Sequence, residues 1–282
     1  MFANTMDFAR PAEALALARA AEDAGFESVW TVEHVVYPEG YESRYPYSPS
    51  GRMPGDASSP LPDPLIWLSY VASATTRIRL ATGVLILPQR NPLVLAKEVA
   101  TLDHLSGGRM VLGIGVGWLE EEFDALGVPF RRRGARADEY IEVMRSLWDA
   151  DHAAHDGEFV SFTDVSSNPK PAAGRVPIVV GGHSEAAARR AGRIGDGFFP
   201  GTGDLPVLFD IVRQTAADAG RDPSAIELTA GHAGMRDDPQ AAAEELASLG
   251  VSRVVVPAFF FTRGDLATNL AEFGDQVIQP SA

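Results

Sequence analysis

Three observations in the 282-residue sequence predict an α/β barrel of eight strand–helix units. Short aliphatic segments alternate with longer helical segments along the whole chain, eight such pairs can be counted, and glycine-bearing loops follow several of the strands. Strict alternation indicates a parallel sheet, and eight repeats favour a closed barrel over an open sheet. We therefore expect residues 1–282 to form a single (β/α)8 TIM-barrel domain.

The first half of the chain supplies four units, with strands expected at residues 2–5, 28–32, 78–84 and 109–114. Segment 78–84 is aliphatic and is too short for a typical helix. Pro11 suits the first turn of a helix over 11–24, and Ser106-Gly107-Gly108 ends a helix over 93–105. The other helices are expected near 64–74 and, after a break at 127–129, over 135–148.

The second half repeats this pattern with shorter units. Strands are expected at residues 176–180, 197–199, 226–230 and 253–257, each followed by a helix, over 185–193, 205–219, 239–249 and 265–273. Two insertions interrupt the alternation. Residues 35–63, after the second strand, are crowded with Pro, Gly, Ser and Tyr, and loops of this length are usually functional lids or disordered. Residues 149–174, between the fourth helix and the fifth strand, contain a hairpin that turns at Asp156-Gly157.

Composition excludes several classes of function. The net charge of −14 disfavours nucleic acid and anionic membrane as partners, and the absence of cysteine excludes a disulfide framework, a thiolate metal site and a cysteine nucleophile. No apolar run approaches 18 residues, and the first residues lack the basic and apolar regions of a signal peptide. We therefore expect a cytoplasmic protein.

A glycine-rich turn after the fifth strand is the best candidate for binding a phosphate. Gly181 and Gly182 let the backbone approach a ligand, while His183 and Ser184 offer N–H groups and a hydroxyl at a helix N-terminus. The alternative is that Ser184 only caps the helix and the glycines only form the turn. The segment 113–117 does not match the dinucleotide pattern, because its third glycine comes too early.

The candidate for proton transfer is the pair Glu33-His34, which follows the second strand at the rim where barrels place their catalytic residues. A histidine there can exchange a proton near neutral pH, with the neighbouring carboxylate setting its orientation or charge. The alternative is a hydrogen-bonded structural histidine. His152 and His155 have metal-ligand spacing, but they lie in a polar loop without a third ligand, so we expect no metal site.

Two further sets of residues each have two possible roles. The arginines of segment 131–136 suit an anionic ligand tail, although a solvated helix start is the simpler interpretation. The tyrosines at 41, 45 and 47 in the long insertion either close over an aromatic ligand or merely pack within the loop.

With these residues assembled, the chain resembles the luciferase-like flavin and deazaflavin oxidoreductases, the bacterial luciferase superfamily. The similarity covers nearly the whole chain and rests on six segments in order, namely 28–34, 79–84 with 88–92, 105–109, 113–118, 180–185 and 191–197. Overall similarity favours the branch that uses coenzyme F420, an 8-hydroxy-5-deazaflavin.

The resemblance implies a barrel whose rim holds F420 or FMN. It also implies a non-prolyl cis peptide at Gly83-Val84 that supports the ring, and a phosphate in the turn from Gly181 to Ser184. Glu33 and His34 match the family's acidic–histidine pair, and Trp118, Glu121 and Phe123 fall where the family lines the ring. Family members usually have several more apolar residues before the equivalent of Asn4. Either the true start therefore lies upstream or the first strand is short, and no cofactor contact is assigned to this strand or to Asn4.

The expected function is hydride transfer between F420 and a small organic substrate, with His34 supplying a proton. Two alternatives remain, an FMN-dependent monooxygenase fed by a separate reductase and a flavin-binding protein without catalysis. The family also implies a homodimer. Substrate specificity is expected in the insertion 35–63 and in the loops that contain 200–202, His232 and 259–261.

Overall fold

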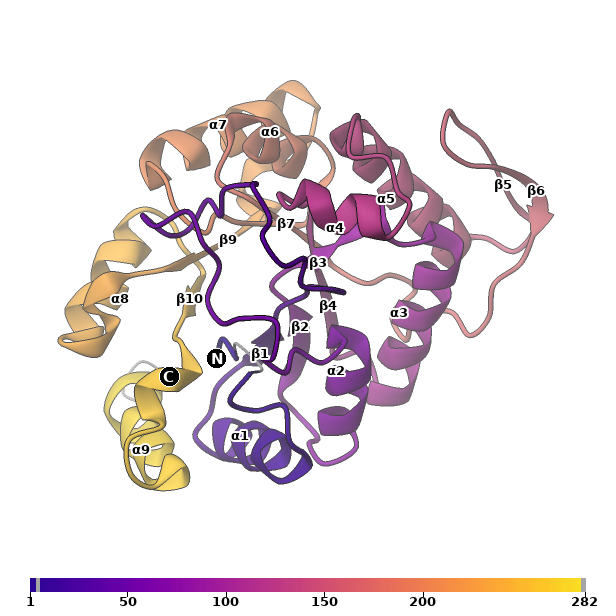
Figure 1. Cartoon of the computed structure of the whole chain (residues 1–282). Coiled ribbons are helices and arrows are strands. Elements are labelled where there is room, and N and C mark those ends of the chain that lie inside the picture. Colours follow the sequence, from indigo (N-terminus) through magenta and orange to yellow (C-terminus); the bar gives the residue numbers. More distant parts are fainter. Residues whose placement is uncertain (4–5, 280–282) are drawn as a thin grey trace.

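The computed structural model describes residues 1–3 and 6–279, and its centre is one curved parallel sheet. The strands lie side by side in the order β1-β2-β4-β7-β8-β9-β10, and helices surround them (Figure 1). Their bounds are β1 Ser28–Thr31, β2 Arg79–Thr82, β4 Met110–Gly115, β7 Ile178–Gly181, β8 Gly197–Phe199, β9 Glu227–Gly231 and β10 Arg253–Val255. The predicted α/β barrel is confirmed, with strands where the alternation placed them.

The first residues of the chain close this sheet. Phe2 forms parallel bridges to Trp30 of β1 and to Pro257 after β10. The Phe2 N–H donates to the Val256 carbonyl at 2.8 Å, and the Ala3 N–H donates to the Trp30 carbonyl at 2.7 Å. The predicted first strand is therefore represented by residues 1–3, while Asn4 and Thr5 lie outside the described residues.

The helices around the sheet begin and end within a few residues of the predicted bounds. They are α1 Pro11–Asp23, α2 Pro64–Ala72, α3 Pro92–Ser106, α5 Arg133–Asp149, α6 Glu185–Ile194, α7 Leu205–Asp218, α8 Pro239–Ser248 and α9 Leu266–Phe273. Local signals set these ends. Asn91 and Asp204, for example, accept hydrogen bonds from the free N–H groups at the starts of α3 and α7, and Gly107 ends α3 at φ +72°. No described helix is both long and apolar enough to cross a membrane.

The predicted third strand is the element that differs most from expectation. It breaks after β2 at a cis peptide between Gly83 and Val84, and the chain continues as the short β3 Leu85–Ile86 and the 3₁₀ helix η1 Leu87–Gln89. The hairpin in the second insertion is confirmed as β5 Ala153–Asp156 and β6 Ser161–Val165, although its connection covers residues 157–160 rather than two residues.

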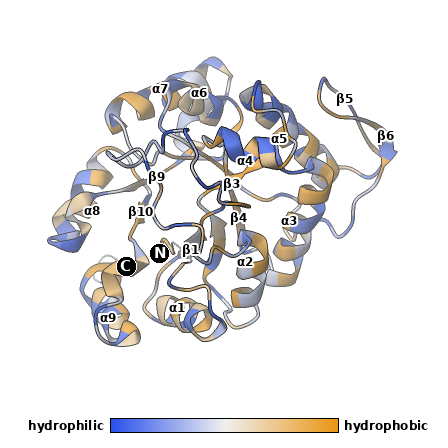
Figure 2. Cartoon of the chain, viewed as in Figure 1, coloured by the Kyte–Doolittle hydropathy of each residue, from blue (hydrophilic) through white to orange (hydrophobic). Residues whose placement is uncertain are grey.

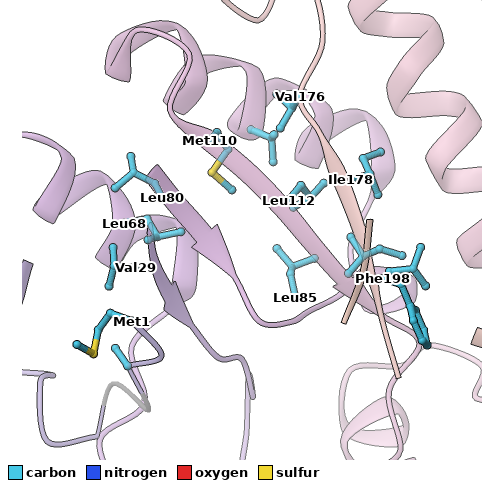
Figure 3. Close-up of a cluster of buried hydrophobic side chains, with 14 of the residues drawn as sticks. Met1, Val29, Leu68, Leu80, Leu85, Met110, Leu112, Val176, Ile178 and Phe198 are labelled. Carbon is cyan, nitrogen blue, oxygen red and sulfur yellow. The ribbon is translucent and has the colours of Figure 1, made fainter. Parts of the chain in front are cut away.

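The apolar core has two layers because successive strand side chains point to opposite faces. The outer layer packs between sheet and helices and includes Val29, Leu80, Met110, Leu112 and Ile178 (Figure 3). In Figure 2 the helices show apolar colour toward the sheet and polar colour away from it. The inner layer, inside the barrel, consists of Trp30, Ala81, Val111 and Val179, with Phe2 and Phe199 packed against them.

Inside the barrel, β4 passes so close to the end of β2 that only glycine fits at position 113. A Cβ atom on Gly113 would lie 1.8 Å from the Thr82 carbonyl oxygen and 3.3 Å from the Trp30 ring. The Thr82 hydroxyl also donates to the Gly113 carbonyl at 2.6 Å. Because Gly113 has no side chain, β4 leaves room for the Thr82 carbonyl, which lies just before the cis peptide.

We expect Gly113→Ala to lower the free energy of unfolding by about 3 kcal/mol or more, since the new methyl group meets a backbone atom that cannot rotate away. The measurement is urea unfolding of the purified protein. Gly231→Ala, on β9 of the same sheet, is the matched control, because the nearest atom to its Cβ position is 3.7 Å away. Equal stability of the two variants would contradict this account of the close contact.

Candidate active site

The candidate residues gather at one end of the barrel because parallel strands bring their carboxyl ends to the same rim. The floor of this rim is the inner aromatic layer. A Cβ on Gly83 would lie 3.1 Å from ring atoms of both Phe2 and Trp30, so the bulge at Gly83-Val84 lies directly against that layer. The predicted cis peptide at this bond is present.

Val84 is seated between the ends of two strands that carry glycine. A Cβ on Gly115, at the end of β4, would lie 2.6 Å from Val84 Cγ2, and one on Gly181, at the end of β7, would lie 2.5 Å from Val84 Cγ1. Gly181 therefore has a packing function in addition to its predicted part in a phosphate-binding turn. The bulge and the turn after β7 form one contiguous surface.

Glu33 is buried beneath the bulge, with its side chain 1% exposed. Its Oε2 accepts the Ile86 N–H at 2.5 Å, and its Oε1 accepts Arg90 Nε at 2.9 Å together with Arg90 Nη2. Arg90 Nη2 also donates to Asp63 Oδ2 at 2.6 Å. Burial alone would lower the pKa of the Arg90 guanidinium, but the Glu33 and Asp63 carboxylates raise it. Glu33 therefore holds the segment after the bulge in place.

The carboxylate in contact with His34 belongs to Glu122, and the expectation that neighbouring Glu33 orients His34 was wrong. His34 Nδ1 lies 3.0 Å from Glu122 Oε2. The side chain of Glu122 is fully buried, whereas 17% of the His34 side chain is exposed. Glu122 lies on the short helix α4 Glu120–Ala125, beside the buried Phe123. Glu122 shares the buried face of this helix with Leu119 and Phe123, but the sequence does not show that this face meets His34.

Glu121, predicted to line the cofactor ring, binds the first insertion. Its Oε1 accepts the N–H groups of Glu42 at 2.6 Å and Ser43 at 3.0 Å. Burial opposes ionisation, but hydrogen bonds from Ser43 and Glu42 lower the pKa of Glu121 to about 2. Its other oxygen, Oε2, is buried and has no hydrogen-bond partner among the described residues.

The insertion 35–63 crosses the rim (Figure 1). It carries a row of aromatic side chains. Trp118, from the loop after β4, contacts the edges or faces of Tyr41, Tyr45 and His34 at ring-centroid distances of 5.2 to 5.8 Å. Tyr47 continues the row and lies 5.3 Å from the His183 ring. The tyrosines therefore connect the β4 side of the rim with the β7 side. Trp118 contacts Tyr41 and Tyr45, and Tyr45 in turn contacts Tyr47.

In the turn after β7, Gly182 and Ser184 have the structural roles given above as the alternative to phosphate binding. Gly182 adopts φ +124°, which favours glycine, and its N–H donates to the Phe199 carbonyl at 3.2 Å. Ser184 Oγ accepts the Ala187 N–H and so caps α6. His183 Nδ1 is buried and has no partner among the described residues. The donors left for an anion are the N–H groups of His183 and Ser184, for which no hydrogen bond is found in the described part of the chain.

The two remaining sequence candidates are bound to other parts of the protein. In the arginine cluster, Arg132 pairs with Glu158, Arg133 Nε donates to the Gly117 carbonyl at 3.1 Å, and Arg136 donates to the Pro129 carbonyl at 2.7 Å. In the loop after α5, His152 Nδ1 contacts Asp164 Oδ1 at 2.6 Å. Residues 1–3 and 6–279 contain no group of three or more side chains able to hold a metal ion.

Comparisons with known proteins agree with this geometry. A family model described as luciferase-like monooxygenase matches residues 3–276. An uncharacterized protein of Mycobacterium bovis is 38% identical over 208 residues, which are 73% of this chain and 72% of that protein. An F420-dependent glucose-6-phosphate dehydrogenase of Kineococcus radiotolerans is 34% identical over 218 residues, which are 74% of this chain and 59% of that enzyme.

A solved structure shows the same fold over nearly the whole chain. It is the coenzyme F420-dependent tetrahydromethanopterin reductase from Methanopyrus kandleri, with a TM-score of 0.74, 19% identity and coverage of 96% of both chains. The chain belongs to the luciferase-like monooxygenase family. The resemblance drawn from the sequence motifs is thereby confirmed, and F420-dependent enzymes are among the relatives.

We expect Arg90→Leu to lower the free energy of unfolding by about 3–5 kcal/mol, because it leaves the Glu33 carboxylate buried without its partner. Urea unfolding measures the change. Arg132→Leu serves as the control: it removes an ion pair whose side chains are 57% and 54% exposed, and should cost less than about 1 kcal/mol. If the two variants lose similar amounts, Glu33 does not depend on Arg90 in the folded protein.

Proposed function

We propose that this member of the luciferase-like monooxygenase family is an oxidoreductase that transfers a hydride between coenzyme F420 and a small organic substrate. The observation that carries the proposal is His34, held by a buried carboxylate at the rim that also carries the Gly83-Val84 bulge. The relatives named as F420-dependent support the choice of cofactor.

The residues at the rim fit such a cofactor. His183 Nδ1 and Glu121 Oε2 are buried polar atoms without a partner among the described residues; His183 contacts Tyr47, and Glu121 binds the insertion at Glu42 and Ser43. Tyr47 packs against His183 and so closely on Gly201 that a Cβ there would lie 2.4 Å from its ring. Tyr47 therefore lies beside the turn after β7, where the phosphate would bind.

Each part of the rim has a proposed role. The bulge at Gly83 and Val84, together with Trp118 and Glu121, would hold the deazaflavin ring. The segment from Gly181 to Ser184 would hold the phosphate through N–H groups of its last two residues. The cofactor, when bound, supplies the hydride chemistry, while the protein supplies binding, orientation and electrostatics. His34 moves the proton that must accompany hydride transfer to or from the substrate.

A second candidate is an FMN-dependent monooxygenase that receives reduced flavin from a separate reductase. The observation that favours it is the family itself, whose description is a luciferase-like monooxygenase. The same rim would hold FMN, because the phosphate turn and the ring bulge suit either cofactor. The third candidate, a flavin-binding protein without catalysis, differs only in lacking turnover.

Titration of the protein with F420 and with FMN in parallel tests the cofactor. Trp118 lies at the rim, so its fluorescence should fall as the ring binds. We expect saturable quenching by F420 and a much weaker response to FMN. Tight FMN binding with oxygen consumption would instead support the monooxygenase, and tight binding without turnover in the presence of candidate substrates would support the binding protein.

Replacement of His34 tests proton transfer. General acid–base help is typically worth about 10²–10⁴ in rate, so we expect His34→Ala to lower kcat by that factor while cofactor affinity stays within about tenfold. His34→Asn keeps a donor for Glu122 but cannot exchange the proton, and should be nearly as slow. The prediction fails if both variants bind cofactor far more weakly and the bound fraction turns over at the normal rate.

A further inference from the structure

We infer that Glu122 is a positioning residue that fixes His34 as the tautomer protonated on Nδ1, so that Nε2 is the nitrogen that exchanges protons. The catalytic meaning of this inference rests on the proposed function. The tautomer itself is a property of the protein without cofactor or substrate, and it can be measured separately.

The hydrogen bonds around Glu122 assign the proton. Glu122 Oε1 accepts the Val35 N–H at 2.6 Å and the Val36 N–H at 3.3 Å, while Oε2 faces His34 Nδ1 at 3.0 Å. An ionised carboxylate can only accept hydrogen bonds, so Nδ1 must carry the hydrogen between them. Burial opposes ionisation of Glu122, but the hydrogen bonds from His34 and Val35 hold its pKa below the ordinary value.

The other ring nitrogen is left for exchange. No hydrogen bond joins His34 Nε2 to another described residue, and it is not among the buried polar atoms without a partner. Trp118 packs edge-on to the His34 ring at 5.8 Å and an interplanar angle of 83°, which restricts rotation of the imidazole. A neutral imidazole protonated on Nδ1 has its lone pair on Nε2, and this nitrogen can accept a proton.

The same geometry predicts what happens when Glu122 becomes Gln. The amide has one oxygen and one NH₂ group, and the oxygen must face Val35, because an NH₂ group cannot accept the Val35 N–H at 2.6 Å. The NH₂ group then faces His34 Nδ1 and donates to it. His34 must therefore move its hydrogen to Nε2, so the substitution inverts the tautomer while nearly preserving size and shape.

The experiment is ¹⁵N NMR of protein labelled on its six histidines, at about pH 8.5, roughly two units above the ordinary imidazole pKa. The His34 signals are identified by their loss in His34→Asn. Glu121→Gln is the matched control, since it makes the same change one residue earlier on α4 and touches the insertion at Glu42 and Ser43 rather than His34.

We expect a protonated Nδ1 and an unprotonated Nε2 in the wild-type protein and in Glu121→Gln, and the reverse in Glu122→Gln. A wild-type His34 protonated on Nε2 would overturn the inference without any variant, and so would an unchanged tautomer in folded Glu122→Gln.

The kcat of Glu122→Gln then distinguishes the role of Glu122 in fixing the tautomer from the role of His34 in the proposed reaction. If both hold, Glu122→Gln lowers kcat of the F420-loaded enzyme by about 10²–10⁴ with KM nearly unchanged, since Nε2 can no longer accept a proton. Inversion of the tautomer with normal kcat would still support the positioning role of Glu122, but it would remove His34 from the proposed reaction.

Discussion

The buried ion pair between Glu33 and Arg90 is the interaction on which the rim depends. A buried carboxylate is costly unless it is paired and hydrogen-bonded, and Glu33 satisfies this condition through Arg90 and the Ile86 N–H. These contacts fix three segments that are distant in sequence: the end of β1, the chain just after the Gly83-Val84 bulge, and, through Asp63, the start of α2. The bulge can therefore keep one position at the carboxyl ends of the strands.

Asp63 and two further carboxylates, Glu121 and Glu122, hold the first insertion against the barrel. Glu122 accepts the N–H groups at its beginning, Glu121 accepts those of Glu42 and Ser43 in its middle, and Asp63 at its end binds Arg90. Some of the acidic residues of the chain therefore serve to hold the insertion at this rim. Because the insertion is held at these three points, its tyrosines reach from Trp118 to His183.

The glycines at the rim have packing and backbone functions that do not depend on a ligand. Gly115 and Gly181 leave room for Val84, and Gly182 supplies a positive φ in the turn. These requirements exist without any ligand, so the presence of glycine in the turn is not by itself evidence for a phosphate site. The stronger argument is the set of unused donors that the turn leaves at His183 and Ser184, at the end of the strand next to the bulge.

The sequence by itself determined the eight-unit barrel, the helix ends and the position of the rim, because these depend on local periodicity, capping residues and turn residues. The family motifs also located the cis peptide at Gly83-Val84. Only the tertiary structure decided which carboxylate serves His34. Glu33 is its neighbour in the chain, but the Glu33 carboxylate binds Ile86 and Arg90, and the partner of His34 is Glu122, 88 residues away. Contacts of this range depend on how the elements pack together, and no local pattern in the sequence encodes them.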